Sequence, residues 1–222
     1  MIEGLAKPWG ELALYNRYAT YLWESKLPYV DFFLEYPPLS LPFFWIAQVF
    51  GEKWFTLTWY GLIGLFVLAT FLMIKKMGGR GFAFIASILP LAGLFWDRFD
   101  MIPAFFSLWA VILLKKEKYS QSWFFLGLAI LVKIYPVVLL PYFLVKTPLK
   151  SILRCLLPLT IPILLLLGII SLYGGLEGLK GFAKFQGVRG VHLESVRAIP
   201  YLLDKENSVT EFRHNTFEIG EK

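Results

Sequence analysis

The chain has 222 residues, of which 57% are hydrophobic and 18% aromatic, and its formal net charge is +6. Soluble domains are usually about 45–50% apolar, so this composition argues against a soluble enzyme and indicates a helical membrane protein. The basic residues stand mainly in short clusters between apolar blocks, where they direct membrane topology, and the positive charge therefore does not indicate a nucleic-acid partner. The single cysteine, Cys155, allows no intramolecular disulfide.

The first 53 residues are predicted to form an outer loop with an interfacial helix. The segment 28–38 reads PYVDFFLEYPP, and its prolines argue against a long helix. Asp31 and Glu35 stand there among aromatic residues, where a carboxylate gains basicity and can serve as a general base. The alternative for both is a loop cap or an interfacial salt bridge. Residues 39–50 are apolar but too short to span, so we expect them to lie at the membrane surface.

The middle of the chain, residues 54–173, holds the predicted membrane helices. Two blocks, 54–74 and 152–173, reach the roughly 20 apolar residues that a spanning helix needs. Three shorter apolar blocks lie between them, over residues 81–96, 101–114 and 122–145.

Three basic clusters determine the predicted topology. If all of them are cytoplasmic, residues 81–114 and residues 122–145 each form a hairpin. The arms of the second hairpin reach only about 20 Å, so its turn near Lys133 lies at membrane depth, where backbone must be buried in protein or line a wet cavity. The alternative is one tilted helix over 122–145, and we favour the hairpin. The clusters are Lys75, Lys76 and Arg80; Lys115, Lys116 and Lys118; and Lys146, Lys150 and Arg154.

This topology places two further groups of charged residues on the outer side. Asp97, Arg98 and Asp100 fall at the tip of the first hairpin. Asp100 suits the N-cap of a helix that begins at Met101, and Asp97 can pair with Arg98; the functional alternative is contact with a sugar or a phosphate. Lys133 lies where the positive-inside rule requires no cation, and its ammonium suits a lipid-linked phosphate.

Residues 174–200 are expected to form a second outer loop, and the polar tail 204–222 has no assigned structure. Because His192 has no second histidine at ligand spacing, we predict no metal site. The loop also carries side chains suited to phosphate or sugar recognition, namely Gln186, Arg189, His192 and Glu194.

Three motifs occur in a recognisable order along the chain. They are ELALY at 11–15 with LPYVDFFLEYPPL at 27–39, then VKIYPVVLLP at 132–141, then RGVHLES at 189–195. Together they resemble the first outer loop, the Lys-x-Tyr-Pro segment and the second outer loop of glycosyltransferase family 87. This family is a branch of the C-type glycosyltransferases, which depend on polyprenyl-phosphate sugars.

The resemblance implies a membrane hexosyltransferase, similar to mannosyltransferases. Such an enzyme moves sugar from a polyprenyl phosphate to a hydroxyl of a glycan or glycolipid acceptor on the extracytoplasmic face, usually with inversion. By motif position the base falls on Glu11, where the family usually has aspartate, with Asp31 as its rival. Glu35 shapes the pocket, and Lys133 and Arg189 hold the donor phosphate. The family has a helix before these motifs and more after them, so we expect the chain to be part of a longer enzyme.

We therefore predict an all-α, polytopic helical membrane protein with a C-type glycosyltransferase-like fold. It forms one transmembrane domain over 1–222, with an outer loop at 1–53, membrane helices at 54–173, and an outer loop and tail at 174–222. We expect a multi-pass protein of a prokaryotic plasma membrane that binds the donor, the acceptor and membrane lipid and uses no cofactor. The alternative is a non-catalytic lipid-phosphate-binding protein or a transporter fragment. The predicted catalytic residues are Glu11 and Asp31, and the predicted substrate-binding residues are Glu35, Asp97, Arg98, Asp100, Lys133, Gln186, Arg189, His192 and Glu194.

Overall fold

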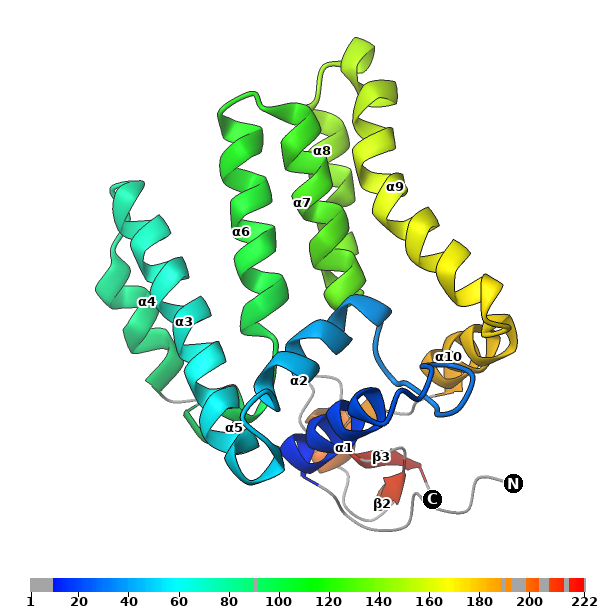
Figure 1. The fold of residues 1–222 in the computed structure, drawn as a ribbon. Coiled ribbons are helices and arrows are strands. Elements are labelled where there is room, and N and C mark those ends of the chain that lie inside the picture. Colours follow the sequence, from blue (N-terminus) through cyan, green and yellow to red (C-terminus); the bar gives the residue numbers. More distant parts are fainter. Residues whose placement is uncertain are drawn as a thin grey trace.

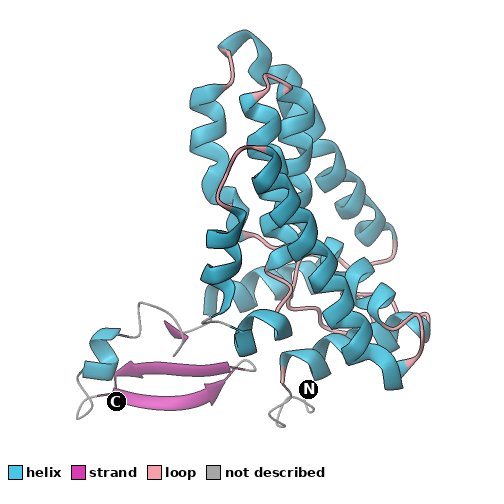
Figure 2. Ribbon diagram, turned by 90° about the vertical axis from the view of Figure 1, so that its left-hand side faces the viewer, coloured by secondary structure: helices cyan, strands magenta, loops and turns pink. Residues whose placement is uncertain are grey.

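The protein, described here by a computed structural model, is mostly helical and is built in two parts. A set of long helices stands on a lower layer of short helices and loops, with a small sheet at the same end (Figure 1). Seen from the side, the sheet lies at the foot of the helices (Figure 2). The structure describes residues 10–89, 92–188, 191–192, 199–203, 208–213 and 216–221.

The standing helices come from the middle of the chain. Their residues are predominantly Leu, Ile, Val and Phe, with polar residues gathered at the ends, which is the composition of helices that face an apolar environment. They are α3 (Phe55–Lys76), α4 (Gly81–Ile88), α6 (Met101–Lys115), α7 (Tyr119–Val132), η4 (Tyr135–Leu139) with α8 (Leu140–Lys146), and α9 (Leu149–Leu172).

Two of these helices, over Glu52–Lys76 and Leu149–Leu172, are long and apolar enough to cross a membrane. Only 17% of the most apolar window of each is buried, whereas the core helix of a soluble protein would be mostly buried. Their exposed apolar surface therefore needs lipid or a protein partner to cover it.

The lower layer is made of short elements, most of them from the two ends of the chain and one, α5, from its middle. Helix α1 buries one face through Leu14, Tyr15, Tyr18 and Ala19, a spacing that places all four on the same side of a helix. The other elements of the layer are η1 (Pro38–Ser40), α2 (Leu41–Ala47), η2 (Glu52–Trp54), α5 (Ala92–Asp97), α10 (Leu176–Val188) and α11 (Ile199–Leu203), and α1 itself covers Glu11–Trp23.

Several helices end with a residue in the left-handed conformation followed by a backbone bond back to the helix. After α3, Gly78 has φ +75° and the N–H of Gly79 donates to the carbonyl of Ile74 at 2.9 Å. After α9, Gly174 has φ +79° and the next residue closes the same kind of bond. Glycine adopts this conformation without a Cβ penalty, so these glycines fix where the two long helices stop.

The interior divides into two clusters. The larger one lies where α1, α2, α3 and the start of α6 meet, and its centre is formed by the stacked rings of Tyr15 and Phe44 with Trp59 packed at an angle against them. The smaller one lies between α6, α7, α8 and α9 and contains Trp123 and Cys155. The larger cluster therefore joins the lower layer to the long helices, and it is this cluster that positions the candidate site.

The three basic clusters lie together at the end of the long helices that points away from the lower layer. They fall on the last residues of α3, α6 and α8, on the turns that follow, and on the start of α9, and Figure 1 shows these ends at the top. Residue Lys133, at the end of α7, and Asp97–Asp100, between α5 and α6, lie at the opposite end. The chain breaks at Lys133 and returns through η4 and α8, as a hairpin rather than one tilted helix.

Three sequence predictions need correction. The expected loop at 174–200 contains helix α10, because Leu179 and Phe182 lie three apart and pack against the larger cluster. The tail, for which no structure was predicted, forms β2 (Ser208–Arg213) and β3 (Thr216–Glu221), a small sheet in a chain that is mostly helical, as expected. The predicted interfacial helix is shorter than expected, since η1 and α2 end at Ala47.

The small sheet has the strand order β1-β3-β2 and is antiparallel throughout. Strand β1 (Val191–His192) pairs Val191 with Ile219, and β2 pairs Thr210 with the same residue from the other side. Ile219, on the central strand β3, is buried. Successive side chains of a strand point to opposite faces of the sheet, so this residue marks the buried face of β3.

Replacing Gly127 by leucine is expected to lower the free energy of unfolding by about 1–3 kcal/mol. Helices α7 and α9 approach closely there, because a Cβ at Gly127 would lie 3.0 Å from the carbonyl oxygen of Leu159. The matched control is Gly168→Leu on α9, where a Cβ would meet nothing within 4 Å. Thermal unfolding of the detergent-solubilised protein measures the difference, and equal midpoints for the two variants would contradict the close packing.

Candidate active site

A carboxylate that accepts two tyrosine hydroxyl groups forms the centre of the site. Glu11 is the first residue of α1. Its Oε2 accepts a hydrogen bond from the Tyr15 hydroxyl at 2.7 Å and another from the Tyr36 hydroxyl at 2.9 Å. Among the described residues, the other oxygen, Oε1, has no hydrogen-bond partner. Two donors thus hold one oxygen and leave the other available to a ligand.

Aromatic rings surround the two tyrosines and fix their positions. The Tyr15 ring stacks on Phe44 with ring centres 4.6 Å apart and an angle of 8° between the planes. Phe99 meets both tyrosine rings edge-on, at 5.4 Å from Tyr15 and 4.9 Å from Tyr36. Trp59 packs against Tyr15 at 4.9 Å, and its indole N–H donates to the carbonyl of Trp96 at 3.0 Å, which ties α3 to α5. Such packing leaves the hydroxyl groups one direction in which to donate.

A second carboxylate lies on the far side of the same tyrosines. Glu35 is 3% exposed, and its backbone N–H donates to the hydroxyl oxygen of Tyr18 at 3.4 Å. The Tyr18 ring meets Tyr36 edge-on at 6.4 Å. The charge of Glu35 acts on Tyr18 and Tyr36, while Glu11 acts on Tyr15, Tyr36 and Tyr18. The two carboxylates therefore share one group of buried phenols.

These surroundings keep the phenols protonated. Burial is the main cause that raises the pKa of Tyr15 well above its usual value, followed by the charges of Tyr36 and Glu11. Burial likewise raises the pKa of Tyr36, and the charges of Glu11 and Glu35 raise it further. A phenol that holds its proton is a hydrogen-bond donor at every physiological pH. The bonds to Glu11 are therefore present throughout that range.

The ammonium group of Lys133 lies next to the aromatic rings that surround Tyr15 and Tyr36. The Lys133 ammonium is 2.7 Å from Oδ1 of Asp100 and 4.8 Å from the centre of the Phe99 ring. The side chains of Lys133 and Asp100 are 28% and 42% exposed, so solvent or a ligand can reach both. The Tyr135 hydroxyl donates to the carbonyl of Asp100 at 3.4 Å. Phe99 contacts Lys133 as well as Tyr15 and Tyr36, so one buried ring links the cation to the two phenols that donate to Glu11.

The structure changes the predicted role of Asp100. It occupies the position before α6, as expected for an N-cap, but its side chain makes no capping hydrogen bond. The Asp100 carboxylate instead forms an ion pair with the ammonium of Lys133, which is 33 residues away in sequence. Both partners of this bond are ionised, whereas only the carboxylate is ionised in a cap bond to a backbone N–H.

The two aspartates of the tip have different partners. Oδ1 of Asp97 accepts from the Tyr60 hydroxyl of α3 at 2.9 Å, whereas Asp100 binds Lys133. They therefore act separately in the structure. Arg98, which lies between them, also has a partner. Within the part of the chain that the structure describes, no three His, Cys, Asp or Glu residues gather as a metal-binding group.

Asp31 lies apart from this cluster in its interactions. Its Oδ2 accepts from the backbone N–H of Leu27 at 2.7 Å, and its own N–H donates to the carbonyl of Leu27 at 2.9 Å. The residue is exposed and closes a turn of five residues. This is the loop cap given above as the alternative for Asp31, whereas Glu11 has two tyrosine donors on one carboxylate oxygen.

Helix α10, in the second predicted outer segment, contacts the first outer segment. Helix α10 packs against the 28–36 loop, with Phe182 facing Tyr29 at 6.3 Å and Phe185 facing Phe33 at 5.1 Å between ring centres. The predicted binding residue Gln186 is on α10 and His192 is on β1, but their side chains lie outside the description. Arg189 and Glu194 lie outside the described residues altogether.

Sequence reasoning missed the phenols that complete the site. Tyr15 carries a usable signal, because residues four apart on a helix face the same way and Glu11 precedes it by four. Tyr36 is 25 residues from Glu11 and Phe99 is further still, so only the folded packing joins them.

Comparisons with protein-family models, with curated proteins and with solved structures give no match for this chain.

Proposed function

We propose that the protein is a membrane glycosyltransferase that moves a hexose of the mannose type from a polyprenyl phosphate to an acceptor hydroxyl. The observation that carries the proposal is the Glu11 carboxylate, with two tyrosines on Oε2 and no described partner on Oε1. A general base needs a lone pair within hydrogen-bond reach of the proton that it takes. Oε1 offers that lone pair on a carboxylate whose orientation is fixed.

The reaction that follows is a single displacement. The acceptor hydroxyl gives its proton to Glu11 and attacks the anomeric carbon, and the bond from that carbon to the phosphate oxygen breaks. The leaving polyprenyl phosphate carries the developing negative charge, and a fixed cation lowers the energy of that charge. The Glu11 cluster consists of Glu11, Tyr15, Tyr36 and Phe99. The ammonium of Lys133 lies over the Phe99 ring of this cluster, so Lys133 is assigned to the donor phosphate.

The salt bridge of Lys133 is compatible with this role and also defines its rival. Asp100 holds the ammonium over Phe99 before a donor arrives, and a phosphate can then share or replace that carboxylate. The second candidate is a non-catalytic protein that binds lipid phosphate through the same ammonium. The observation that favours it is the partial exposure of the Lys133 and Asp100 side chains, 28% and 42%, since a lipid phosphate can reach this pair whether or not transfer follows.

The arrangement of charge along the molecule supports an outer position for the site. The three basic clusters gather at one end of the long helices and the Glu11 cluster at the other. Under the positive-inside rule the basic end faces the cytoplasm, so the proposal places Glu11 and Lys133 on the extracytoplasmic face of a multi-pass protein, as in a prokaryotic plasma membrane.

Single cysteines test this topology. In a Cys155→Ser background, Val30→Cys should react with an impermeant thiol reagent in intact cells, and Ser120→Cys should react only after the membrane is opened. Both positions are exposed, and they lie at opposite ends of the long helices. Labelling of position 120 in intact cells would reverse the topology and remove the extracytoplasmic site.

The activity itself is tested by reconstitution. The purified protein in lipid nanodiscs is given polyprenyl-phosphate mannose with a radiolabelled sugar, together with a lipid extract as the source of acceptor. Transfer of label to a product that no longer carries polyprenyl phosphate supports the enzyme. Binding of the donor without transfer, in the presence of every added acceptor, favours the non-catalytic candidate.

A further inference from the structure

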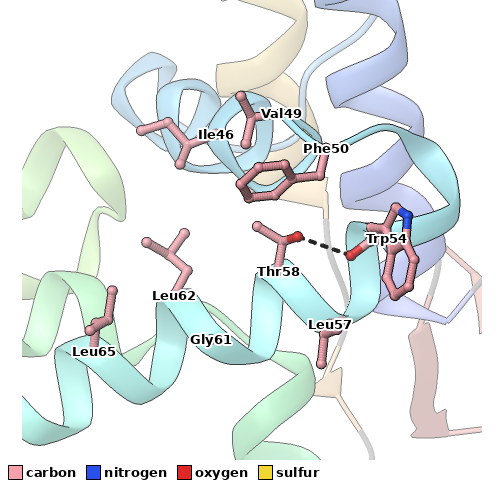
Figure 3. A pocket seen from close by; sticks show the side chains of 9 residues that line it. All are labelled: Ile46, Val49, Phe50, Trp54, Leu57, Thr58, Gly61, Leu62 and Leu65. Carbon is pink, nitrogen blue, oxygen red and sulfur yellow. Dashed lines mark hydrogen bonds between the residues drawn. The ribbon is translucent and has the colours of Figure 1, made fainter.

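A long apolar groove lies between the end of α2 and the first half of α3, away from the Glu11 cluster. It encloses about 780 Å³. Ile46 and Phe50 stand on one side, and Leu62, Leu65 and Gly61 stand on the other side, on α3 (Figure 3). The hydroxyl of Thr58 donates to the carbonyl of Trp54 at 3.0 Å, so it presents no unsatisfied polar group to the groove.

This surface is exposed although it is made of large apolar side chains. Phe50 is 73% exposed, and Leu57 and Leu65 are each 65% exposed. A Cβ added at Gly61 would meet nothing within 4 Å, so the glycine leaves real space and is not required by a close neighbour. Apolar surface of this extent on a helix that is able to cross a membrane is suited to a hydrocarbon chain.

A second hollow of about 370 Å³ adjoins the groove at the turn after α2; it is called the polar hollow because four polar side chains reach it, although apolar atoms form much of its lining. Val49 lines both, and the segment 49–54 contributes alternately to one and to the other. Thr20, Trp23, Glu24, Gln48 and Glu52 supply most of the polar hollow. One ligand can therefore place an apolar chain in the groove and a polar head in the hollow.

Hydrogen bonds hold the polar side chains of the hollow in place. Gln48 is 5% exposed, and its Nε2 donates to Oδ1 of Asn16 at 2.8 Å and to the Thr20 hydroxyl at 2.9 Å. Oε1 of Glu52 accepts from Asn16 at 3.4 Å. The Trp23 ring stacks on Trp45 with centres 4.9 Å apart, and it presents an apolar face at the rim.

The charges of the hollow select the chemistry of the head group. Two carboxylates, Glu24 and Glu52, line it, and none of the described lining residues is basic. Lys26 pairs with Glu24 at 2.7 Å, but it lies outside the lining, and Lys53 rests over the Trp54 ring at 6.0 Å. A phosphate would meet like charge there, whereas hydroxyl groups would donate to the carboxylates.

We propose that groove and hollow together form a binding site for a lipid with an uncharged, hydroxylated head group. Glycolipids have this chemistry: one end is hydrocarbon, and the other carries hydroxyl donors that match carboxylate and amide acceptors. The site stands independently of the transfer reaction. Only its use for an acceptor lipid would rest on the proposed function, since the donor phosphate belongs near Lys133 and not in an acidic hollow.

Photolabelling in nanodiscs tests the site without requiring activity. Two probe lipids carry the same diazirine acyl chain; one has a glucosyl head and the other is a phosphatidic acid. The glucosyl probe should label the groove segments 46–50 and 57–65 in preference to the outward face of α9, and the phosphatidic acid probe should not. Equal labelling of the groove and of α9 would mean ordinary surrounding lipid and would overturn the proposal.

Matched variants separate the groove from the head-group hollow. Gly61→Leu fills the groove without a clash and should lower glucosyl labelling about tenfold, the change expected from losing a few buried methylene contacts. Gly168→Leu, at the open position on α9, should leave it unchanged. The double change Glu24→Gln and Glu52→Gln should remove the discrimination against phosphatidic acid. The site is refuted if Gly61→Leu leaves glucosyl labelling unchanged, or if the double variant still discriminates against phosphatidic acid. It is also refuted if a protein partner, and not lipid, covers the groove.

Discussion

Changing Glu11 to glutamine is expected to reduce sugar transfer by roughly 10²–10⁴-fold while donor binding is retained. The amide has nearly the shape of the carboxylate, and its carbonyl oxygen can still accept from Tyr15 and Tyr36. What it loses is the basic lone pair at the position of Oε1. The turnover of the purified variant and its affinity for a polyprenyl-phosphate sugar, measured separately, check this expectation.

Glutamine is a better choice than alanine for this experiment. Hydrogen bonds to a charged group contribute about 1.5–3 kcal/mol each, and alanine would leave two largely buried phenols without an acceptor. An unfolded variant would then be mistaken for a missing base. The thermal unfolding midpoint of Glu11→Gln should stay near that of the parent protein, so that a loss of turnover can be assigned to proton transfer.

Asp31→Asn is the matched control for the same loop. The asparagine carbonyl can still accept from the N–H of Leu27 and close the turn, so turnover should stay within a few-fold of the parent. If instead Asp31→Asn loses activity and Glu11→Gln does not, the base has been assigned to the wrong carboxylate. If neither variant loses activity, Asp97 is the next candidate, and the Glu11 cluster is structural.

The comparison of these two carboxylates shows what the sequence could predict. Both stand in the first segment, and motif position favoured Glu11 while the flanking prolines favoured Asp31. The decisive difference is the presence of Tyr36, which reaches Glu11 from the end of the loop. A contact over 25 residues depends on how α1, α2 and α3 pack their rings together, and no local pattern contains that information.

Some of the misses had a local signal after all. Residues 216–221 alternate polar and apolar side chains, with Phe217 and Ile219 two apart, which is the pattern of a strand. The region 174–200 was predicted to be a loop, but Leu179 and Phe182 have helical spacing, and α10 forms there although it contains Gly178 and Gly181. Glycine lowers helix propensity by about 1 kcal/mol, and burial of two large side chains outweighs that cost. The ends of the long helices, marked by basic clusters, were the most predictable feature.

The second large effect is expected at Lys133. Lys133→Met should weaken binding of the polyprenyl-phosphate donor about 10- to 100-fold, since one charge-assisted bond to phosphate contributes on the order of 1.5–3 kcal/mol. Methionine keeps an unbranched apolar stem over Phe99 and can make a sulfur–aromatic contact in place of the cation. The fold should therefore tolerate it, and donor titration in nanodiscs measures the change.

The partner residue tells a donor site from a structural ion pair. Asp100→Asn removes the carboxylate and leaves the ammonium free at the same place. If Lys133 serves the donor, Asp100→Asn should bind the polyprenyl-phosphate sugar at least as tightly as the parent, because phosphate no longer competes with a carboxylate. If the pair is structural, both variants should lower the unfolding midpoint alike. A partly exposed ion pair contributes only about 0–1 kcal/mol, so that loss would be small and would leave donor binding, if any, unchanged in both.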